Sequence, residues 1–413
     1  MPARRTVTQR TLLLGVGAAV ALPTLAVLAA PAGATVATTA AARTQTYPVP
    51  SSRVLTVRGH GFGHGHGMSQ YGAWGAARRG LSHQKILAFY YPGTTPGKVT
   101  GKIRVKITAD TTRDVVVSAA AGLEVHDLGS GKTYALPQLA GARRWRLNVD
   151  GKRTVVGWYD GAWHRYQPGG RAALVGDGQL TASGPLTLWL PGGTTRTYRG
   201  SLRAVSPSAG STDRDTVDVL SLDKYVRGVV PAEMPASWSA EAVQAQAVAA
   251  RTYATWSRDL DPTGGWQICD TSACQVYRGV DGEDPRANAA VTATARQVLL
   301  SGGKAAFTQF GSSSGGWTSA GSRPYLAAKA DPYDDFAANP VHDWSVKLTA
   351  ARVQAAYPTL GRLKRILVTA RDGHGQWGGR VSTLRLDGSK HDVTLSGDSF
   401  RAAFGLKSTW FHF

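Results

Sequence analysis

The feature that most constrains this chain is a run in which glycine alternates with larger residues, three of them histidines: Gly59-His60-Gly61-Phe62-Gly63-His64-Gly65-His66-Gly67. Glycine lacks a Cβ, so such a backbone can adopt positive φ or pass close to another group. In an extended run every second residue points to the same side, so His60, His64 and His66 would share one face. We therefore expect the run to line a site. The alternatives are a flexible glycine loop and a metal site made by these three histidines.

The N-terminal segment has the pattern of a secretory signal. Three arginines precede an apolar run over residues 12–30, which is followed by the small residues Ala32-Gly33-Ala34. This pattern predicts a signal peptide over residues 1–34 and hence a secreted or cell-wall protein. An uncleaved membrane anchor is the alternative, although two glycines and a proline interrupt the run. No later segment is long and apolar enough to span a membrane.

Charge and size narrow the class of partner. The chain has 413 residues, 42% of them hydrophobic, which is enough for two or three domains with proper cores. Its formal net charge is +20, and the basic residues are spread along the sequence. In an exported protein this charge favours the anionic polymers of the wall as partners and argues against nucleic acid. The sequence predicts no cofactor.

The order of segments predicts an α+β fold, with an antiparallel β-rich scaffold and a few helices around a cleft. Residues 35–51 are rich in alanine and threonine and predict a disordered spacer. The Gly/His segment, residues 52–97, includes a helix after Ser82. Residues 98–212 alternate in short runs with Asp-Gly turns, typical of antiparallel strands. Residues 213–413 combine strands with helices, one of them on an apolar face from Ala240 to about Trp256.

The chain has two cysteines, Cys269 and Cys274. In an exported protein a local disulfide is the default expectation. Half of a zinc site is the alternative, but it would need two further ligands and no histidine lies nearby in the sequence.

Several separated stretches resemble the SpoIID/LytB family of sporulation and cell-wall proteins. The Gly/His run continues into Met68-Ser69-Gln70-Tyr71-Gly72-Ala73, and the full motif is similar to the signature of that family. The other stretches that carry the resemblance are residues 225–235, 245–253, 270–277, 310–318, 323–326 and 400–413.

The order of these stretches differs from the family pattern. In the family the Gly/His motif follows the C-terminal strand, whereas here it lies near the N-terminus. The resemblance therefore implies a circularly permuted SpoIID-like core, because chain ends that lie close together tolerate such a rearrangement. We expect Val54–Val57 to lie beside Trp410–Phe413, which would bring His64, Gln70 and Tyr71 toward Glu233.

The resemblance also implies a reaction. In the family, the glutamate of the Glu-Met-Pro motif, here Glu233, is the catalytic group of a lytic transglycosylase that cuts peptidoglycan glycan strands and leaves 1,6-anhydro ends. One carboxylate suffices if the C6 hydroxyl of the substrate attacks C1, and apolar neighbours would raise its pKa. The plain alternative is a glutamate near a helix start that interacts with the helix dipole.

The resemblance extends to a set of substrate-binding residues and to no metal ligand. Arg251 is one of the expected substrate-binding residues, and the alternative for it is an ion pair with Asp259 or Glu241. A serine nucleophile has neither a Gly-x-Ser-x-Gly elbow nor an ordered partner in the sequence. The expected substrate-binding residues are Gln246, Arg251, Gln275, Tyr277, Ser312, Ser313, Ser314, His64, His66, Gln70 and Tyr71.

A second class of function is a non-catalytic wall-binding enhancer of an N-acetylmuramoyl-L-alanine amidase, the activity that names the LytB branch. Its partners would be glycan strands and a cell-wall amidase. The presence of Glu233 favours the enzyme, because a binding module does not need an ionisable group at that position.

Overall fold

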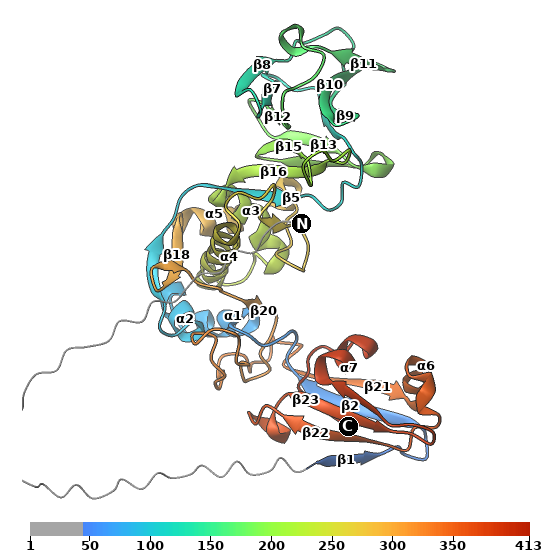
Figure 1. Cartoon of the computed structure of the whole chain (residues 1–413). Helices are drawn as coiled ribbons and strands as arrows, with labels where there is room; N and C mark the ends of the chain where they lie inside the picture. The colour runs from blue at the N-terminus through green and yellow to red at the C-terminus, as the bar shows by residue number, and fades with distance from the viewer. Residues whose placement is uncertain (1–43) are drawn as a thin grey trace, which may run out of the picture. The chain divides into compact units, whose positions relative to one another are not determined.

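A computed structural model describes residues 44–413 (Figure 1). The predicted signal peptide and most of the predicted spacer lie outside this range. The α+β prediction is confirmed, because the described chain combines helices with several mainly antiparallel sheets. Within residues 44–413, no helix has both the length and the apolar character needed to cross a membrane.

The predicted antiparallel β region is confirmed and contains two sheets. Asp150-Gly151 forms a tight turn between two paired strands, with Gly151 at φ 61°. The first sheet has the order β11 (Trp163–Tyr166), β10 (Arg153–Tyr159), β9 (Arg144–Asp150), β6 (Val115–Ser118), β13 (Leu186–Trp189) and β14 (Thr195–Tyr198). The second has the order β17 (Ile268–Cys269), β5 (Lys102–Lys106), β16 (Asp215–Ser221), β15 (Ser201–Val205), β12 (Gly178–Thr181), β7 (Glu124–Asp127) and β8 (Lys132–Ala135).

The second sheet crosses the domain boundary expected at residues 212 and 213. Its strand β16 leads directly into a helix capped by Ser221, whose side chain accepts from the N–H of Lys224. Most buried apolar side chains of the sheet and of the helices belong to one continuous hydrophobic core. The β region and the helices that follow therefore form one folded body.

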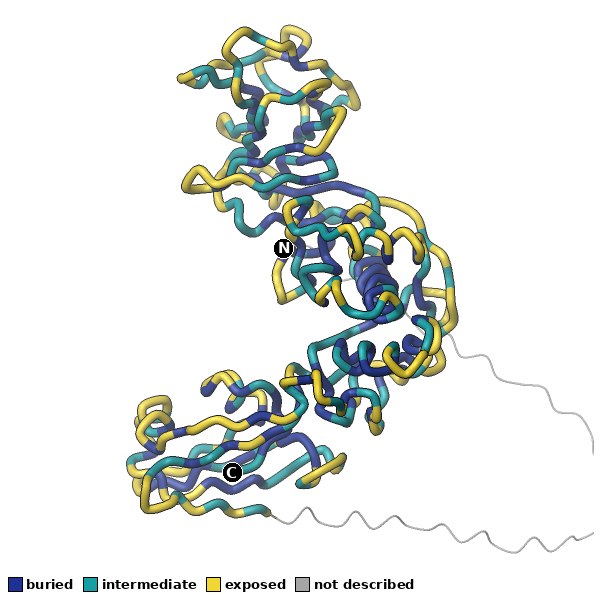
Figure 2. The backbone as a smooth tube through the Cα atoms, turned by 180° about the vertical axis from the view of Figure 1, so that it is seen from behind, coloured by how far each residue is buried: buried dark blue, intermediate teal, exposed yellow. Residues whose placement is uncertain are grey.

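The helices of this body pack around a central helix, α4, which is buried along most of its length (Figure 2). Alanines dominate its buried positions and let neighbouring helices approach closely. It begins after Ser239. The helices are α1 (Gln70–Arg78), α2 (His83–Tyr90), α3 (Leu222–Glu233), α4 (Ala240–Leu260) and α5 (Pro285–Ala293).

Short strands join the Gly/His segment to the region after α5. Residues 304–311 contribute to two different sheets. One sheet has the order β19 (Lys304–Ala305), β18 (Gln297–Ser301) and β4 (Thr95–Lys98), and the other pairs β20 (Phe310–Gly311) in parallel with β3 (Met68–Ser69).

The C-terminal region has its own hydrophobic core, to which both ends of the described chain contribute. One sheet has the order β21 (Asp343–Thr349), β2 (Val54–His60) and β25 (Phe411–His412). The other has the order β1 (Gln45–Pro48), β22 (Arg365–Arg371), β23 (Val381–Asp387) and β24 (Val393–Ser396). Helices α6 (Ala350–Ala356) and α7 (Gly397–Phe404) complete it. Residues 213–413 therefore contribute to two separate hydrophobic cores.

The N-terminal segment does lie beside the C-terminal strand, as the permutation predicts. The register differs: Arg58 and Gly59 pair with His412 and Phe411, while Val54–Val57 pair with β21. A second difference concerns the predicted spacer. Its end, Gln45–Pro48, is a strand because it pairs with β22, and the Tyr47 ring packs 5.2 Å from that of Phe413.

Candidate functional site

Glu233 is the last residue of α3. Pro231 lies in the final turn, and the chain becomes extended at Met234, whose side chain is buried. The C-terminal end of a helix carries partial negative charge, which disfavours a carboxylate there. The interpretation of Glu233 as a stabilising glutamate near a helix start is therefore wrong.

The surroundings of Glu233 favour a protonated carboxyl. Burial raises its pKa above the ordinary value, and a hydrogen bond from the N–H of Val276 to Oε1, 2.9 Å long, opposes part of this rise. Among residues 44–413 Glu233 makes no ion pair. A half-buried carboxyl with one neutral donor can hold a proton that a surface glutamate would lose.

A disulfide loop presents Val276 to Glu233. Cys269 and Cys274 are joined, with Cα atoms 5.5 Å apart, which is the disulfide alternative expected from export. The next residue, Gln275, is buried, accepts from the Tyr225 hydroxyl at 3.1 Å and donates to the carbonyl of Ala250. These contacts hold the backbone around Val276 in place.

Tyr277 is also a positioning residue in this structure. Its hydroxyl donates to Oδ2 of the buried Asp218 at 2.7 Å. Burial raises the pKa of Asp218 to about 7 despite this bond. Because Gln275 and Tyr277 are buried and occupied internally, their side chains hold the loop rather than face a substrate.

Arg251 and Gln246 are both completely buried on α4. The Arg251 guanidinium donates to Asp223 at 2.7 Å, and not to Asp259 or Glu241, and it also reaches backbone carbonyls of α5 and β18. It ties α3, α4 and α5 together, so its guanidinium is engaged inside the fold. Gln246 finds no hydrogen-bond partner among the described residues.

The three histidines of the Gly/His run do not share one face. Gly61, Gly63, Gly65 and Gly67 all have positive φ, between 68° and 114°, so the backbone is not the extended strand that would align them. His64 and His66 stack with ring centroids 4.9 Å apart, whereas His60 ends β2 and stacks on Trp377. The metal site from His60, His64 and His66 is therefore wrong.

His64 is held as a neutral ring. Burial, with the charges of His66 and Arg380, lowers its pKa to about 4. Its Nδ1 accepts the backbone N–H of His66 at 2.9 Å, which assigns the proton to Nε2.

The Gly/His motif meets the segment after Glu233 through aromatic rings. The Tyr71 ring lies 4.8 Å from that of Trp238, and Trp74 stacks on the same indole at 4.5 Å with an angle of 7° between the planes. Gln70 starts α1 and is buried. Within the described chain, no hydrogen bond or ion pair joins Glu233 to His64, Gln70 or Tyr71.

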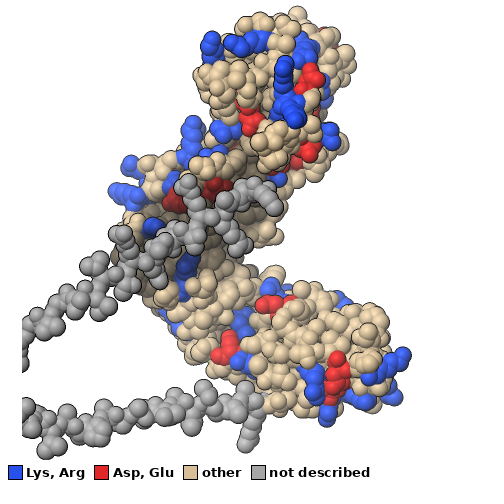
Figure 3. All heavy atoms as spheres, viewed as in Figure 1, with Lys and Arg blue, Asp and Glu red and all other residues tan. Residues whose placement is uncertain are grey.

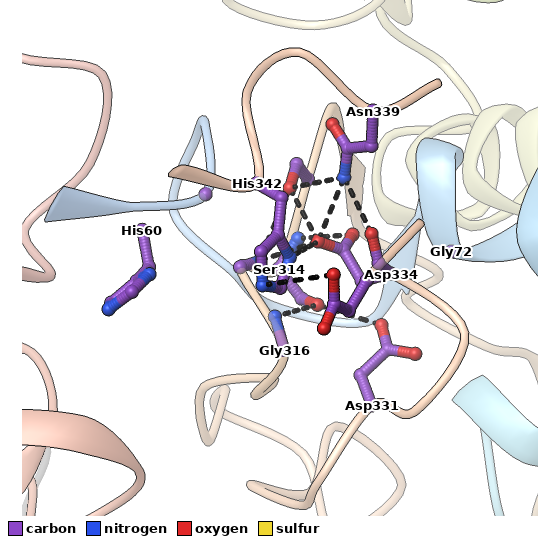
Figure 4. A network of polar contacts seen from close by, with 12 residues as sticks. His60, Gly72, Ser314, Gly316, Asp331, Asp334, Asn339 and His342 are labelled. Atoms are coloured by element: carbon purple, nitrogen blue, oxygen red, sulfur yellow. Dashed lines mark hydrogen bonds and ion pairs between the residues drawn. The ribbon is translucent and has the colours of Figure 1, made fainter. Parts of the chain in front are cut away.

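The serine loop is part of a buried polar network (Figure 4). Ser313 donates to Asp334 at 2.7 Å and Ser314 to Asp331 at 2.8 Å, while the Ser312 carbonyl accepts from the N–H of Tyr71. The hydroxyls of Ser313 and Ser314 are thus engaged inside the protein. A serine nucleophile also lacks a base, because Ser313 bonds the carboxylate of Asp334 and not a histidine.

Sequence reasoning missed the acidic half of this network. Asp334 is completely buried and accepts from Ser69, Asn339 and His342, at distances from 2.5 to 3.0 Å. The sequence did contain a sign of an acidic cluster, because Asp331, Asp334 and Asp335 fall within five residues. The network joins the start of α1 to the serine loop and to the first residues of the C-terminal region.

Basic side chains are distributed over the surface. Lys and Arg lie across the face drawn in Figure 3, with Asp and Glu among them, and form no single patch there. The spread agrees with the sequence, and it does not point to one docking position.

Comparison with known proteins matches the segment that carries Glu233 to a known family model. The family model SpoIID, described as Stage II sporulation protein, matches residues 211–300, which contain α3, α4 and the disulfide loop. Over this segment the chain is similar to proteins of the SpoIID/LytB family. This match agrees with the resemblance seen in the motifs, and the SpoIID/LytB motif at residues 59–73 lies outside the matched segment.

Curated proteins similar to this chain include an amidase enhancer and Stage II sporulation protein D. The amidase enhancer of Bacillus subtilis is 39% identical over 130 residues, which is 30% of this chain and 17% of that protein. Stage II sporulation protein D of Bacillus amyloliquefaciens is 30% identical over 235 residues, or 50% of this chain and 64% of that protein. The matched region thus spans less than two thirds of either relative.

Proposed function

We propose that the chain is an exported lytic transglycosylase that cleaves peptidoglycan glycan strands, with Glu233 as acid and base. The observation that carries the proposal is the state of this carboxyl: half-buried at a helix C-terminus, with a raised pKa and one neutral donor. A hydrolase that uses two carboxylates would need a second one at the site. A single carboxyl fits a reaction in which the substrate supplies its own nucleophile.

The proposed reaction is balanced without water. Val276 binds Oε1 of Glu233, so Oε2 is free to carry the acidic proton. Glu233 gives this proton to the glycosidic oxygen as the bond from C1 of N-acetylmuramic acid breaks. The C6 hydroxyl of the same sugar then attacks C1 and returns its proton to Glu233. The products are a 1,6-anhydro end and a free 4-hydroxyl on N-acetylglucosamine.

The aromatic group of Tyr71, Trp74 and Trp238 is the proposed sugar-binding surface. Its rings are half-buried, and Trp238 lies five positions after the acid. Aromatic rings offer a large apolar face with a polar edge, which suits the mixed surface of a pyranose. The signal pattern of residues 1–34 and the net charge of +20 support action at an anionic cell wall.

The test is mass spectrometry of peptide-stripped glycan after digestion. The wild-type protein should produce 1,6-anhydro ends and Glu233→Gln should produce none, because the amide cannot give up a proton. Glu124→Gln, an exposed glutamate on β7, is the matched control and should retain activity. Unchanged activity in Glu233→Gln would reject the role of Glu233, and a water-derived reducing end would change the reaction to hydrolysis.

A second candidate function is stimulation of a cell-wall amidase, favoured by the name of the Bacillus subtilis relative. The two functions differ in their need for an ionisable residue 233. An enhancer would leave glycan strands uncut yet increase amidase turnover, and Glu233→Gln would stimulate as well as the wild type.

A further inference from the structure

The pairing of β2 with β21 places two histidines and an aspartate together. His60 lies directly opposite Asp343 in the register, and His342 precedes Asp343. The backbone N–H of Gly61 donates to the His342 carbonyl at 2.9 Å, which fixes this corner. One nitrogen or oxygen from each of the three side chains lies within 4.8 Å of the others. We propose that His60, His342 and Asp343 bind a divalent transition-metal ion.

His342 is oriented as metal-binding histidines usually are. Its Nδ1 donates to Oδ2 of Asp334 at 3.0 Å, and Asp334 is completely buried with its other contacts fixed by serine, asparagine and backbone donors (Figure 4). A carboxylate on one ring nitrogen sets the tautomer and leaves the lone pair of Nε2 for a metal. Asp334 is thus a positioning residue for the proposed ligand.

His60 is equally fixed and has an unsatisfied nitrogen. Its ring stacks on Trp377 at 4.4 Å and meets Trp410 at 4.8 Å, while Nε2 lies 2.6 Å from Oε1 of Gln376. If Nε2 carries the proton, Nδ1 presents a lone pair. That Nδ1 is buried without a hydrogen bond, although an Asp343 oxygen lies 2.6 Å away. A cation bound to both atoms, on the side where they face His342, would satisfy the nitrogen and the carboxylate.

Asp343, the third proposed ligand, lies where solvent can reach the site. The Asp343 side chain is 73% exposed, whereas that of His60 is 12% exposed. An ion would therefore enter from solvent and keep at least one position for water. Two imidazoles and one carboxylate suit Zn²⁺ and its first-row neighbours, whereas Mg²⁺ and Ca²⁺ prefer oxygen ligands.

Calorimetric titration of the tag-free, EDTA-treated chain with Zn²⁺ tests the proposal. With the disulfide intact, we expect one Zn²⁺ per chain. His60→Ala and Asp343→Asn should each weaken binding by about tenfold or more, since one ligand is lost. Asp160→Asn is the matched control, because Asp160 also contacts a histidine, His164, at 2.9 Å on the surface; its titration should match the wild type.

Two further measurements distinguish the loss of a metal ligand from a loss of folding or of the Glu233 site. Metal-free Asp343→Asn should unfold at the wild-type temperature, because the side chain is exposed. Glu233→Gln should bind Zn²⁺ normally, so the test is independent of the proposed reaction. No binding by the wild type at about 0.1 mM Zn²⁺, or equal binding by Asp343→Asn and wild type, would overturn the proposal.

Discussion

The backbone N–H of Val276 donates to Oε1 of Glu233 over 2.9 Å, and this bond joins the disulfide loop to the end of α3. The two partners are 43 positions apart in the sequence. The bond fixes one oxygen of the carboxyl and leaves the other to carry a proton. Any change that moves the loop should therefore alter both the orientation and the pKa of Glu233.

The first prediction concerns pH. Burial raises the folded pKa of Glu233 above 4.5, so the stability linked to this group is present below pH 4.5 and is lost as pH rises through the folded pKa. Glu233→Gln removes that loss. Its melting temperature should equal that of the wild type at pH 4 and exceed it at pH 8. An equal or lower value at pH 8 would show that the carboxylate is not penalised in the fold.

The second prediction concerns the disulfide. Replacing Cys269 and Cys274 together by serine should lower the free energy of unfolding by about 2 kcal/mol, because a short loop is released in the unfolded chain. Strand cleavage should also fall, since Val276 is no longer held against Glu233. The measurements are denaturant unfolding and the anhydro-end assay, with reduced wild type as the comparison. Bound zinc that disappears in this variant would indicate a thiolate site instead.

The third prediction uses two glycines with similar backbone angles. Gly67 has φ 68°, and a Cβ there would lie 2.1 Å from the carbonyl oxygen of Gln309. Gly80 has φ 81° with open space around it. Gly80→Ala should cost about 1 kcal/mol from backbone strain alone, and Gly67→Ala about 3 kcal/mol or more. Similar losses in urea unfolding would mean that the close passage at Gly67 is unimportant.

The fourth prediction concerns His64. Burial and nearby positive charge lower its pKa to about 4, so the ring should stay neutral down to about pH 5. A histidine with a lowered folded pKa stabilises the fold above its unfolded pKa of about 6.5 and loses that contribution as pH falls toward 4. Titration of the imidazole resonances checks this. Titration of His64 near pH 6.5 would contradict the burial argument.

The sequence was most informative where a local pattern or a family motif determines the structure. Alternation predicted the antiparallel region, and the alanine spacing predicted α4. The motif order predicted that β2 would lie beside the last strand. These features depend on nearest neighbours along the chain or on a known motif.

The parts that could not be predicted depend on contacts between distant residues. Asp334 accepts from Ser69, 265 positions away, and this partner gives the serine loop a structural role. The glycines from Gly61 to Gly67 adopt positive φ where this segment passes the loop around Ser313. The prediction of an extended run, with His60 on the same face as the other two histidines, was therefore wrong. The role of Arg251 in the core likewise depends on its contacts with α5 and β18, which come at least 40 residues later in the sequence.

The placement of β2 between β21 and β25 has a consequence for biosynthesis. β2 is made early, yet Trp344, which donates to the carbonyl of Gly61, comes 283 residues later. The first strand of the C-terminal sheet must therefore wait, unpaired, until nearly the whole polypeptide has left the ribosome. Completion of this sheet is a late event in folding, and a chain arrested before residue 343 leaves β2 without either of its neighbours.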